Sequence, residues 1–204
     1  LGLLGSVLPA LKQLTLIDSP GAAGPDGVQL LAEGLVAGAL PAVTFFGIYG
    51  MHVGDAGASA LAAALDRGAL PRLKTLQLLN AAIGDAGLVA LAPALRRRPA
   101  LELINLYGNP FGDEGLAALV APPPPPAGAL PPPTGVLTKL KVLNLSSTQV
   151  TDAGCVALAA AFDSGALPAL EDILLWRIPA SAVAEAAVKE ALKRTGASRA
   201  ALPS

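Results

Sequence analysis

The sequence predicts an α/β solenoid in which a strand, a turn, a helix and a second turn repeat about six times over 204 residues. Three recurring signatures predict it: an L-x-x-L-x-L frame, a Gly-Asp-Ala-Gly turn after the frame, and a Gly-Ala-Leu-Pro segment that closes the unit. One such unit cannot bury both its strand and its helix. Stacked units therefore form a parallel sheet, an outer layer of helices and one continuous apolar core between them.

The strand frame occurs in six places. Residues 71–78 match residues 138–145 over the whole segment. The remaining four copies place apolar residues at Leu11/Leu14/Leu16, Val43/Phe46/Ile48, Leu101/Ile104/Leu106 and Leu170/Ile173/Leu175. Side chains alternate along a strand, so the residues of this frame should point into the core.

A helix should begin after each strand, at an aspartate in a glycine-rich turn. The turns are Gly54–Gly57, Gly84–Gly87, Gly112–Gly115 and Thr151–Gly154, with a looser Pro25–Gly27 first. Helical spacing follows, as in Ala58/Leu61/Leu65, Leu88/Leu91/Leu95 and Cys155/Leu158/Phe162. We expect Asp55, Asp85, Asp113 and Asp152 to cap their own helices, because their Ala and Gly neighbours offer no further cation ligands.

The Gly-Ala-Leu-Pro segments end the helices, because Gly terminates a helix well and Pro cannot continue it. They predict one domain over 1–204. Its repeats lie near 9–40, 41–70, 71–98, 99–130, 138–167 and 168–195, with a Pro-rich insertion at 121–137 and a cap-like helix at 181–195.

These signatures resemble the ribonuclease-inhibitor-like leucine-rich repeats, a class shared with NOD-like receptors and Ran GTPase-activating proteins, over nearly the whole chain. The resemblance implies a leucine-rich-repeat solenoid, a horseshoe segment with the parallel β-sheet on its concave face and α-helices on its convex face. In that class an Asn commonly follows the last strand Leu by three positions. Only Asn109 does so here, against Ser19, Met51, Ala81 and Thr148, which argues against a regular side-chain ladder at that bend.

Composition excludes several classes of partner and location. The net charge is -1 and the pI about 5.8, so no overall positive field favours nucleic acid or anionic lipid. The apolar stretch 28–48 is long enough to span a membrane, but Gly38, Pro41 and Gly47 interrupt it. The single cysteine, Cys155, cannot form an internal disulfide and fits a reducing compartment, so we expect cytoplasmic residence. The chain lacks an initiator Met, which suggests a piece of a longer protein.

Catalytic motifs are missing, so we expect neither an enzyme nor a metal or other cofactor. His52 should be an exposed turn residue, and Cys155 should be a buried structural thiol because Ala58, Leu88 and Leu116 align with it. Residues 96–98, three consecutive arginines, should form a solvated helix end that suits the helix dipole.

The candidate binding surface comes from comparing equivalent strand positions. The position after the last strand Leu reads Ile17, Tyr49, Leu79, Tyr107, Ser146 and Trp176, and so collects both tyrosines and the only tryptophan. The adjacent exposed position reads Thr15, Gly47, Gln77, Asn105, Asn144 and Leu174. Tyr and Trp are enriched in binding hot spots, so we predict partner binding by Tyr49, Leu79, Tyr107, Ser146, Trp176, Gln77, Asn105 and Asn144. The alternative is that the rings merely cover the sheet.

Two segments depart from the repeat. The proline run Pro122–Pro126, continued to Pro133, is either a low-complexity loop or a polyproline II ligand, at 122–133, for a proline-recognising domain. Residues 181–194 should form a helix that caps the solenoid and ends at Gly196, with Glu185/Lys189 and Glu190/Arg194 paired in i,i+4 order.

The function predicted from these features is a non-enzymatic recognition module that holds a protein of unknown identity against the concave sheet face. Two alternatives stay open. One is a regulator of a small GTPase, which the resemblance to Ran GTPase-activating proteins implies by fold analogy alone. The other is a structural spacer in a cytoskeletal or ciliary assembly.

Overall fold

A six-stranded parallel sheet forms the inner layer of the molecule. The computed structural model describes residues 10–17, 31–32, 35, 40–120 and 137–200, the last five by their backbone alone. The strands are β1 (Gln13–Ile17), β2 (Phe45–Tyr49), β3 (Thr75–Leu79), β4 (Leu103–Asn105), β5 (Val142–Asn144) and β6 (Asp172–Leu174). They pair in sequence order, each with the next. Neighbouring strands in the chain are therefore neighbours in the sheet, as the repeat predicts.

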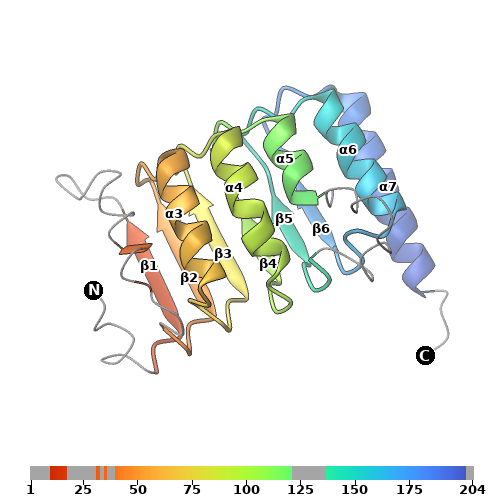
Figure 1. Ribbon diagram of the computed structural model, residues 1–204. Coiled ribbons are helices and arrows are strands. Elements are labelled where there is room, and N and C mark those ends of the chain that lie inside the picture. The colour runs from red at the N-terminus through yellow and green to blue at the C-terminus, as the bar shows by residue number, and fades with distance from the viewer. Residues whose placement is uncertain (1–9, 18–30, 33–34, 36–39, 121–136, 201–204) are drawn as a thin grey trace, which may run out of the picture.

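Helices cover one face of this sheet (Figure 1). They are α3 (Gly54–Asp66), α4 (Asp85–Arg96), α5 (Asp113–Val120), α6 (Asp152–Asp163) and α7 (Ala182–Ala200). Each packs against the next along the row. The predicted apolar stripes are confirmed: Leu88, Leu91 and Leu95 of α4 are fully buried. The helix expected in the first repeat lies mostly outside the described residues.

The core lies between the sheet and the helices and is built from equivalent positions of successive repeats. One row in register runs Leu14, Phe46, Leu76, Ile104, Leu143 and Ile173. Burying an aliphatic side chain of this size contributes about 1.5–3 kcal/mol. Because each layer touches only its neighbours, the solenoid owes its stability to contacts between adjacent repeats.

The turn aspartates do not cap their own helices, which corrects the sequence prediction. Asp85 Oδ1 accepts hydrogen bonds from the backbone N–H groups of Gly112, at 2.9 Å, and Gly115, at 2.7 Å, where the next helix begins. Asp55 does the same for Gly84 and Gly87. The carboxylate thus reaches across the repeat boundary. It caps a neighbour and joins two units at once.

The glycine that ends the turn motif has a packing reason. A Cβ built on Gly87 would lie 2.5 Å from Asp55 Oδ1 and 3.0 Å from the Asp55 backbone Cα. On Gly115 it would lie 2.9 Å from Asp85 Oδ1. The Asp and Gly of the motif therefore serve different contacts. The Asp reaches forward to the next repeat, and the Gly makes room for the Asp of the preceding one.

At the bend after β4, the side-chain amide of Asn109 joins two repeats through hydrogen bonds of both its nitrogen and its oxygen. Its Nδ2 donates to the carbonyls of Leu78, at 2.7 Å, and Leu106, at 2.8 Å, and its Oδ1 accepts from the N–H groups of Ala81 and Ile83 at 3.1 Å. Ala81, its equivalent in the preceding repeat, is a recipient of this bridge. The predicted absence of a regular asparagine ladder holds at the described bends.

The three consecutive arginines at the end of α4 bridge neighbouring repeats, so the prediction of a merely solvated helix end is wrong. Arg96 donates to the Ala118 carbonyl, Arg98 to those of Leu65 and Leu70, and Arg97 forms an ion pair with Asp66. Helix C-termini leave carbonyls without partners inside the helix. The guanidinium groups supply such partners across repeat boundaries, Arg98 to Leu65 of the preceding helix and Arg96 to Ala118 of the following one.

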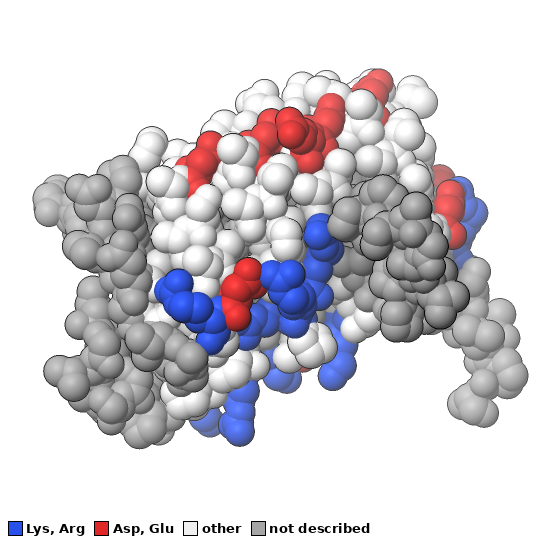
Figure 2. Space-filling model, viewed as in Figure 1, with Lys and Arg blue, Asp and Glu red and all other residues white. Residues whose placement is uncertain are grey.

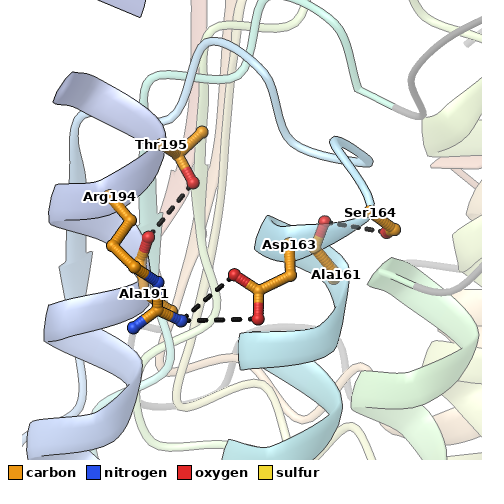
Figure 3. Close-up of polar contacts among 6 residues, drawn as sticks. All are labelled: Ala161, Asp163, Ser164, Ala191, Arg194 and Thr195. Atoms are coloured by element: carbon orange, nitrogen blue, oxygen red, sulfur yellow. Dashed lines mark hydrogen bonds and ion pairs between the residues drawn. The ribbon is translucent and has the colours of Figure 1, made fainter. Parts of the chain in front are cut away.

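Helix α7 packs on α6 at the C-terminal end, where it was expected as a cap (Figure 1). Ser181 joins the ladder, since its N–H and Oγ donate to Asp152 and its Oγ accepts from Ala184 N. Two details were predicted wrongly. Arg194 reaches Asp163 of α6 at 3.1 Å instead of Glu190, because that contact joins the two helices (Figure 3). The helix also continues through Gly196 to Ala200.

The other ion pairs of α7 run along its surface. Glu185 pairs with Lys189 at 3.9 Å, as predicted, and Glu190 pairs with Lys193 at 2.7 Å. The proline-rich insertion lies, apart from Leu137, outside the described residues, as does Ser19.

Candidate functional site

The face of the sheet that the helices leave uncovered, called the open face below, carries three columns of side chains. Strand β3 shows the alternation, with Leu76 and Leu78 buried in the core and the flanking positions partly exposed. The strand register aligns the columns. Beyond the strand ends, backbone hydrogen bonds from Asn80 to Tyr107, Gly108 to Ser146 and Ser147 to Trp176 continue this alignment. The first column is Gln13, Phe45, Thr75, Leu103, Val142 and Asp172, the second is Thr15, Gly47, Gln77, Asn105, Asn144 and Leu174, and the third is Ile17, Tyr49, Leu79, Tyr107, Ser146 and Trp176.

Two aromatic rings meet over a glycine on β2. A Cβ built on Gly47 would lie 3.0 Å from Tyr49 Cε2 and 3.1 Å from Phe45 Cε1, so both rings occupy the space above this residue. The Tyr49 hydroxyl donates to Gln77 Oε1 at 2.6 Å. Burial raises the pKa of Tyr49. The ring is therefore held in place by its own sheet, with part of its surface still exposed.

Trp176, in the same column, is more exposed than Tyr49. Trp176 is 59% exposed, and the guanidinium of Arg177 lies 4.1 Å from the centroid of its ring. Ser146 is 3% exposed, and its Oγ accepts from the Trp176 N–H at 3.1 Å. Of these two predicted contact residues, Trp176 has a large surface exposed to solvent. Ser146 offers little and instead holds the backbone that carries the tryptophan.

The asparagines of the second column bond to the ends of their own strands. Asn105 Oδ1 accepts from the Tyr107 N–H at 3.1 Å, and Asn144 Oδ1 from the Ser146 N–H at 3.0 Å. Their amide nitrogens have no acceptor within the described part of the chain. Each asparagine therefore keeps its donor group available for a ligand beside the third column.

The first column was missed by the sequence prediction. Phe45, Leu103 and Val142 belong to it and are only partly buried, although they do not belong to the leucine frame. The alternation that exposed the other two columns applies equally to this one. Its residues widen the apolar part of the open face.

The residues considered for chemistry lie apart from the open face. His52 is exposed in the turn after β2, as predicted. Cys155 is 2% exposed, which confirms a buried thiol, and burial together with the charges of Asp152, Glu185 and Asp113 raises its pKa to about 11. Among the described residues, no three His, Cys, Asp or Glu side chains gather as a metal site would require. None of the described helices is long and apolar enough to cross a bilayer.

Comparison with known proteins agrees with this architecture. The family model for the Leucine Rich repeat matches residues 70–92, 101–120 and 136–159. The chain contains leucine-rich repeats. These matches cover three consecutive strand-and-helix units and include the turn aspartates of α4, α5 and α6.

Two solved structures resemble the chain over most of its length. A structure described as the C-terminal domain of Caenorhabditis elegans tropomodulin aligns with a TM-score of 0.52 at 15% identity, covering 97% of this chain and 91% of that one. Another, described as actin-binding site 2 of leiomodin-1, gives 0.50 at 14% identity and covers 97% and 87%. At such identities the likeness concerns the fold. No curated protein sequence matches the chain with significance.

Proposed function

We propose that the chain is a non-enzymatic recognition module that binds another protein on the open face of its sheet, with Tyr49, Tyr107 and Trp176 as anchors. One observation carries the proposal. The only tryptophan and both tyrosines of the sequence occupy equivalent positions of three repeats, Tyr49 at the end of β2 and Tyr107 and Trp176 two residues after the ends of β4 and β6. This face is the part of the sheet that the helices do not cover.

The physical chemistry of the column suits protein recognition. Tyr and Trp bury a large area at a small cost in side-chain entropy, and each carries a polar group that can form a hydrogen bond. Asn105 and Asn144 add amide donors beside them, and Phe45, Leu103 and Val142 extend the apolar area. Such a mixture of aromatic, apolar and uncharged polar groups is typical of the centre of an interface.

The structurally similar proteins suggest one partner to test. Leiomodin-1 is described as having an actin-binding site of this fold, and leucine-rich repeats generally bind proteins. Fold likeness alone does not transfer a partner. Actin is therefore one member of a test panel. We also propose the ribonuclease-inhibitor-like class and cytoplasmic residence, on the long helices of the repeats and the reduced, buried Cys155.

The test places a photo-crosslinking amino acid at two positions, Leu79 on the open face, between Tyr49 and Tyr107 in the third column, and Val156 on the helix face. Leu79 is partly exposed and Val156 is 68% exposed, so both positions can react. Proteins joined only through the Leu79 position are purified, and their affinity is measured for the wild type and for Tyr49→Ala/Tyr107→Ala/Trp176→Ala. We expect a loss of about 100-fold, since a hot-spot truncation costs at least about 1–2 kcal/mol.

The matched control removes exposed apolar groups from the helices. Val89→Ala/Val156→Ala/Val183→Ala should leave the affinity unchanged, since these residues lie on α4, α6 and α7. Unchanged affinity in the aromatic triple variant, with an unaltered unfolding transition, refutes the proposal. So does crosslinking that is stronger through Val156.

A further inference from the structure

Acidic side chains line one edge of the molecule and most basic side chains line the opposite edge, where carboxylates also occur, although the net charge is only -1 (Figure 2). The acidic residues Asp55, Asp85, Asp113, Glu114 and Asp152 lie where helices begin. The opposite edge, where strands begin and helices end, is called the basic edge below. It carries Lys12, Arg67, Arg72, Lys74, Arg96, Arg97, Arg98, Lys139 and Lys141, which is nine of the 14 Lys and Arg residues.

Part of the basic edge has a structural role. Arg67, Arg96 and Arg98 donate to backbone carbonyls of neighbouring repeats, and Arg97 is paired with Asp66 at 2.6 Å. These four groups are already used to join repeats. They cannot be assigned to a ligand.

Five cations remain. One is Lys12 before β1, and the other four form two basic pairs, Arg72/Lys74 before β3 and Lys139/Lys141 before β5, with Glu102 of the intervening repeat between the pairs. The Glu102 N–H donates to the Lys74 carbonyl at 2.7 Å, and the Lys141 N–H donates to the Glu102 carbonyl at 2.8 Å. The three repeats are therefore direct neighbours at this edge. Lys74 Nζ lies 3.0 Å from Glu102 Oε1.

The other three cations of the two pairs have no such partner. Arg72, Lys139 and Lys141 are exposed and pair with no carboxylate in the described part of the chain. The pKa of Glu102 is lowered, first by its hydrogen bond to Lys74 and then by the positive charges of Lys74, Lys141 and Lys139. Several cations thus act on one small region of the edge. Three carboxylates lie in or beside the same row, Glu102, Glu171 and Asp172, and of these Glu102 forms an ion pair, with Lys74, in the described part of the chain.

We propose that the basic edge around Arg72, Lys74, Lys139 and Lys141 is a docking surface for an acidic polypeptide segment. The spacing fits an extended chain. Neighbouring strands lie about 4.8 Å apart, so the two basic pairs are separated by about 10 Å. Side chains on one side of an extended peptide recur about every 7 Å, so two or three successive carboxylates on that side span both pairs.

A polypeptide fits this edge better than a polynucleotide. Glu102, Glu171 and Asp172 lie in or beside the same row, and a continuous phosphate backbone would be repelled by each of them. A peptide can place its carboxylates opposite the cations alone. It can also pack apolar side chains on Leu103 and Val142, which follow Glu102 and Lys141 directly on the open face.

The basic edge contains none of the three aromatic anchors. Leu103 and Val142 belong to both surfaces, but the variants below remove only cations of the edge, so this inference is tested separately from the proposed function. The test titrates the full chain into a fluorescein-labelled dodecapeptide of alternating Glu and Ala, with alternating Gln and Ala as the uncharged control. We expect binding of the Glu peptide alone. It should weaken steeply between about 50 and 300 mM NaCl, since the screening length falls to roughly 6 Å over that range.

Two triple variants that remove the same number of positive charges test where the peptide binds. Arg72→Gln/Lys139→Gln/Lys141→Gln should weaken Glu-peptide binding about tenfold or more, because each exposed charge contributes up to about 1 kcal/mol. Lys189→Gln/Lys193→Gln/Arg194→Gln removes the same residue types from α7. This variant should change the affinity for the Glu peptide less than twofold. Tyr49→Ala/Tyr107→Ala/Trp176→Ala, which tests the proposed function, should also leave it unchanged.

Three outcomes overturn the inference. The first is no binding of the Glu peptide at 50 mM NaCl. The second is an equal loss in the two glutamine triple variants, which shows an effect of net charge alone. The third is tighter binding of a single-stranded DNA dodecamer that depends on the same edge, which assigns the surface to nucleic acid.

Discussion

Asp85 and Gly115 belong to neighbouring repeats, and Asp85 Oδ1 lies 2.7 Å from the backbone nitrogen of Gly115. The same oxygen accepts from Gly112. One carboxylate therefore starts the helix that follows its own. Such a bond makes the beginning of each helix depend on the repeat before it, in agreement with the nearest-neighbour stability of solenoids.

Replacing Asp85 should therefore destabilise the chain through α5. We expect Asp85→Ala to lower the free energy of unfolding in urea by about 2 kcal/mol, the upper range for loss of a helix cap. Asp85→Asn should lower the free energy of unfolding much less, because the asparagine carbonyl oxygen can accept both hydrogen bonds. Glu114→Ala, an exposed residue of the same helix, should change stability by less than about 0.5 kcal/mol. Equal losses in the Ala and Asn variants of Asp85 would contradict the cross-repeat cap.

Gly87 should tolerate no side chain. We expect Gly87→Ala to cost about 1–3 kcal/mol, since the added methyl group overlaps Asp55 and forces the backbone or the carboxylate to move. The control is Gly112→Ala, whose nearest contact, at 3.4 Å from the Gln149 carbonyl oxygen, is of ordinary length. Chemical denaturation compares the two. A Gly87 variant as stable as the Gly112 variant would show that the turn glycine is not needed for packing.

Asn109 should be the most sensitive polar residue of the core. It is 1% exposed and bonds to five backbone groups of two repeats, so Asn109→Ala leaves several buried polar groups unpaired. We expect a loss of about 3–5 kcal/mol. Thr148→Val removes one buried hydrogen bond, to the Leu145 carbonyl, and should cost about 1 kcal/mol. The idea fails if the two losses, measured by thermal or urea unfolding, are the same.

The raised pKa of Cys155 makes stability depend on alkaline pH. The thiol titrates at about 11 in the folded chain against 9.0 for the reference group, so folding favours the protonated form. This contribution is fully present below pH 9 and is lost as the pH rises from 9 through 11, because the unfolded chain releases its proton first. Unfolding free energies at pH 8 and 10.5 measure the loss. Cys155→Ala should show a smaller decrease over this interval, and an equal decrease in both proteins would refute the assignment.

Most of the fold could be predicted from the sequence repeat. The L-x-x-L-x-L frame predicted the strands and their core residues, and the helical stripes predicted Leu88, Leu91 and Leu95 as buried. These features depend on side-chain alternation and helical periodicity, which are local. Alignment with the other repeats also predicted that Cys155 is buried and that His52 is exposed.

Contacts between repeats were less predictable. Asp85, Arg98 and Arg194 each occur at a position that suits a local role, respectively a helix start, a helix end and an i,i+4 pair. Each instead bonds to a neighbouring element. Sequence spacing gives no measure of the distance between stacked turns, and a long side chain takes the partner that stacking brings near.

The sequence by itself determined the repeating unit, the layer order and the column that holds Tyr49, Tyr107 and Trp176, because a period of two along strands and a fixed repeat decide which positions align. Tertiary structure alone decided which groups bond across the repeats and where charge accumulates. A net charge of -1 gave no sign of the basic edge. The stacking of successive helix ends and strand starts produced it, by bringing cations that are far apart in the chain to one side of the molecule.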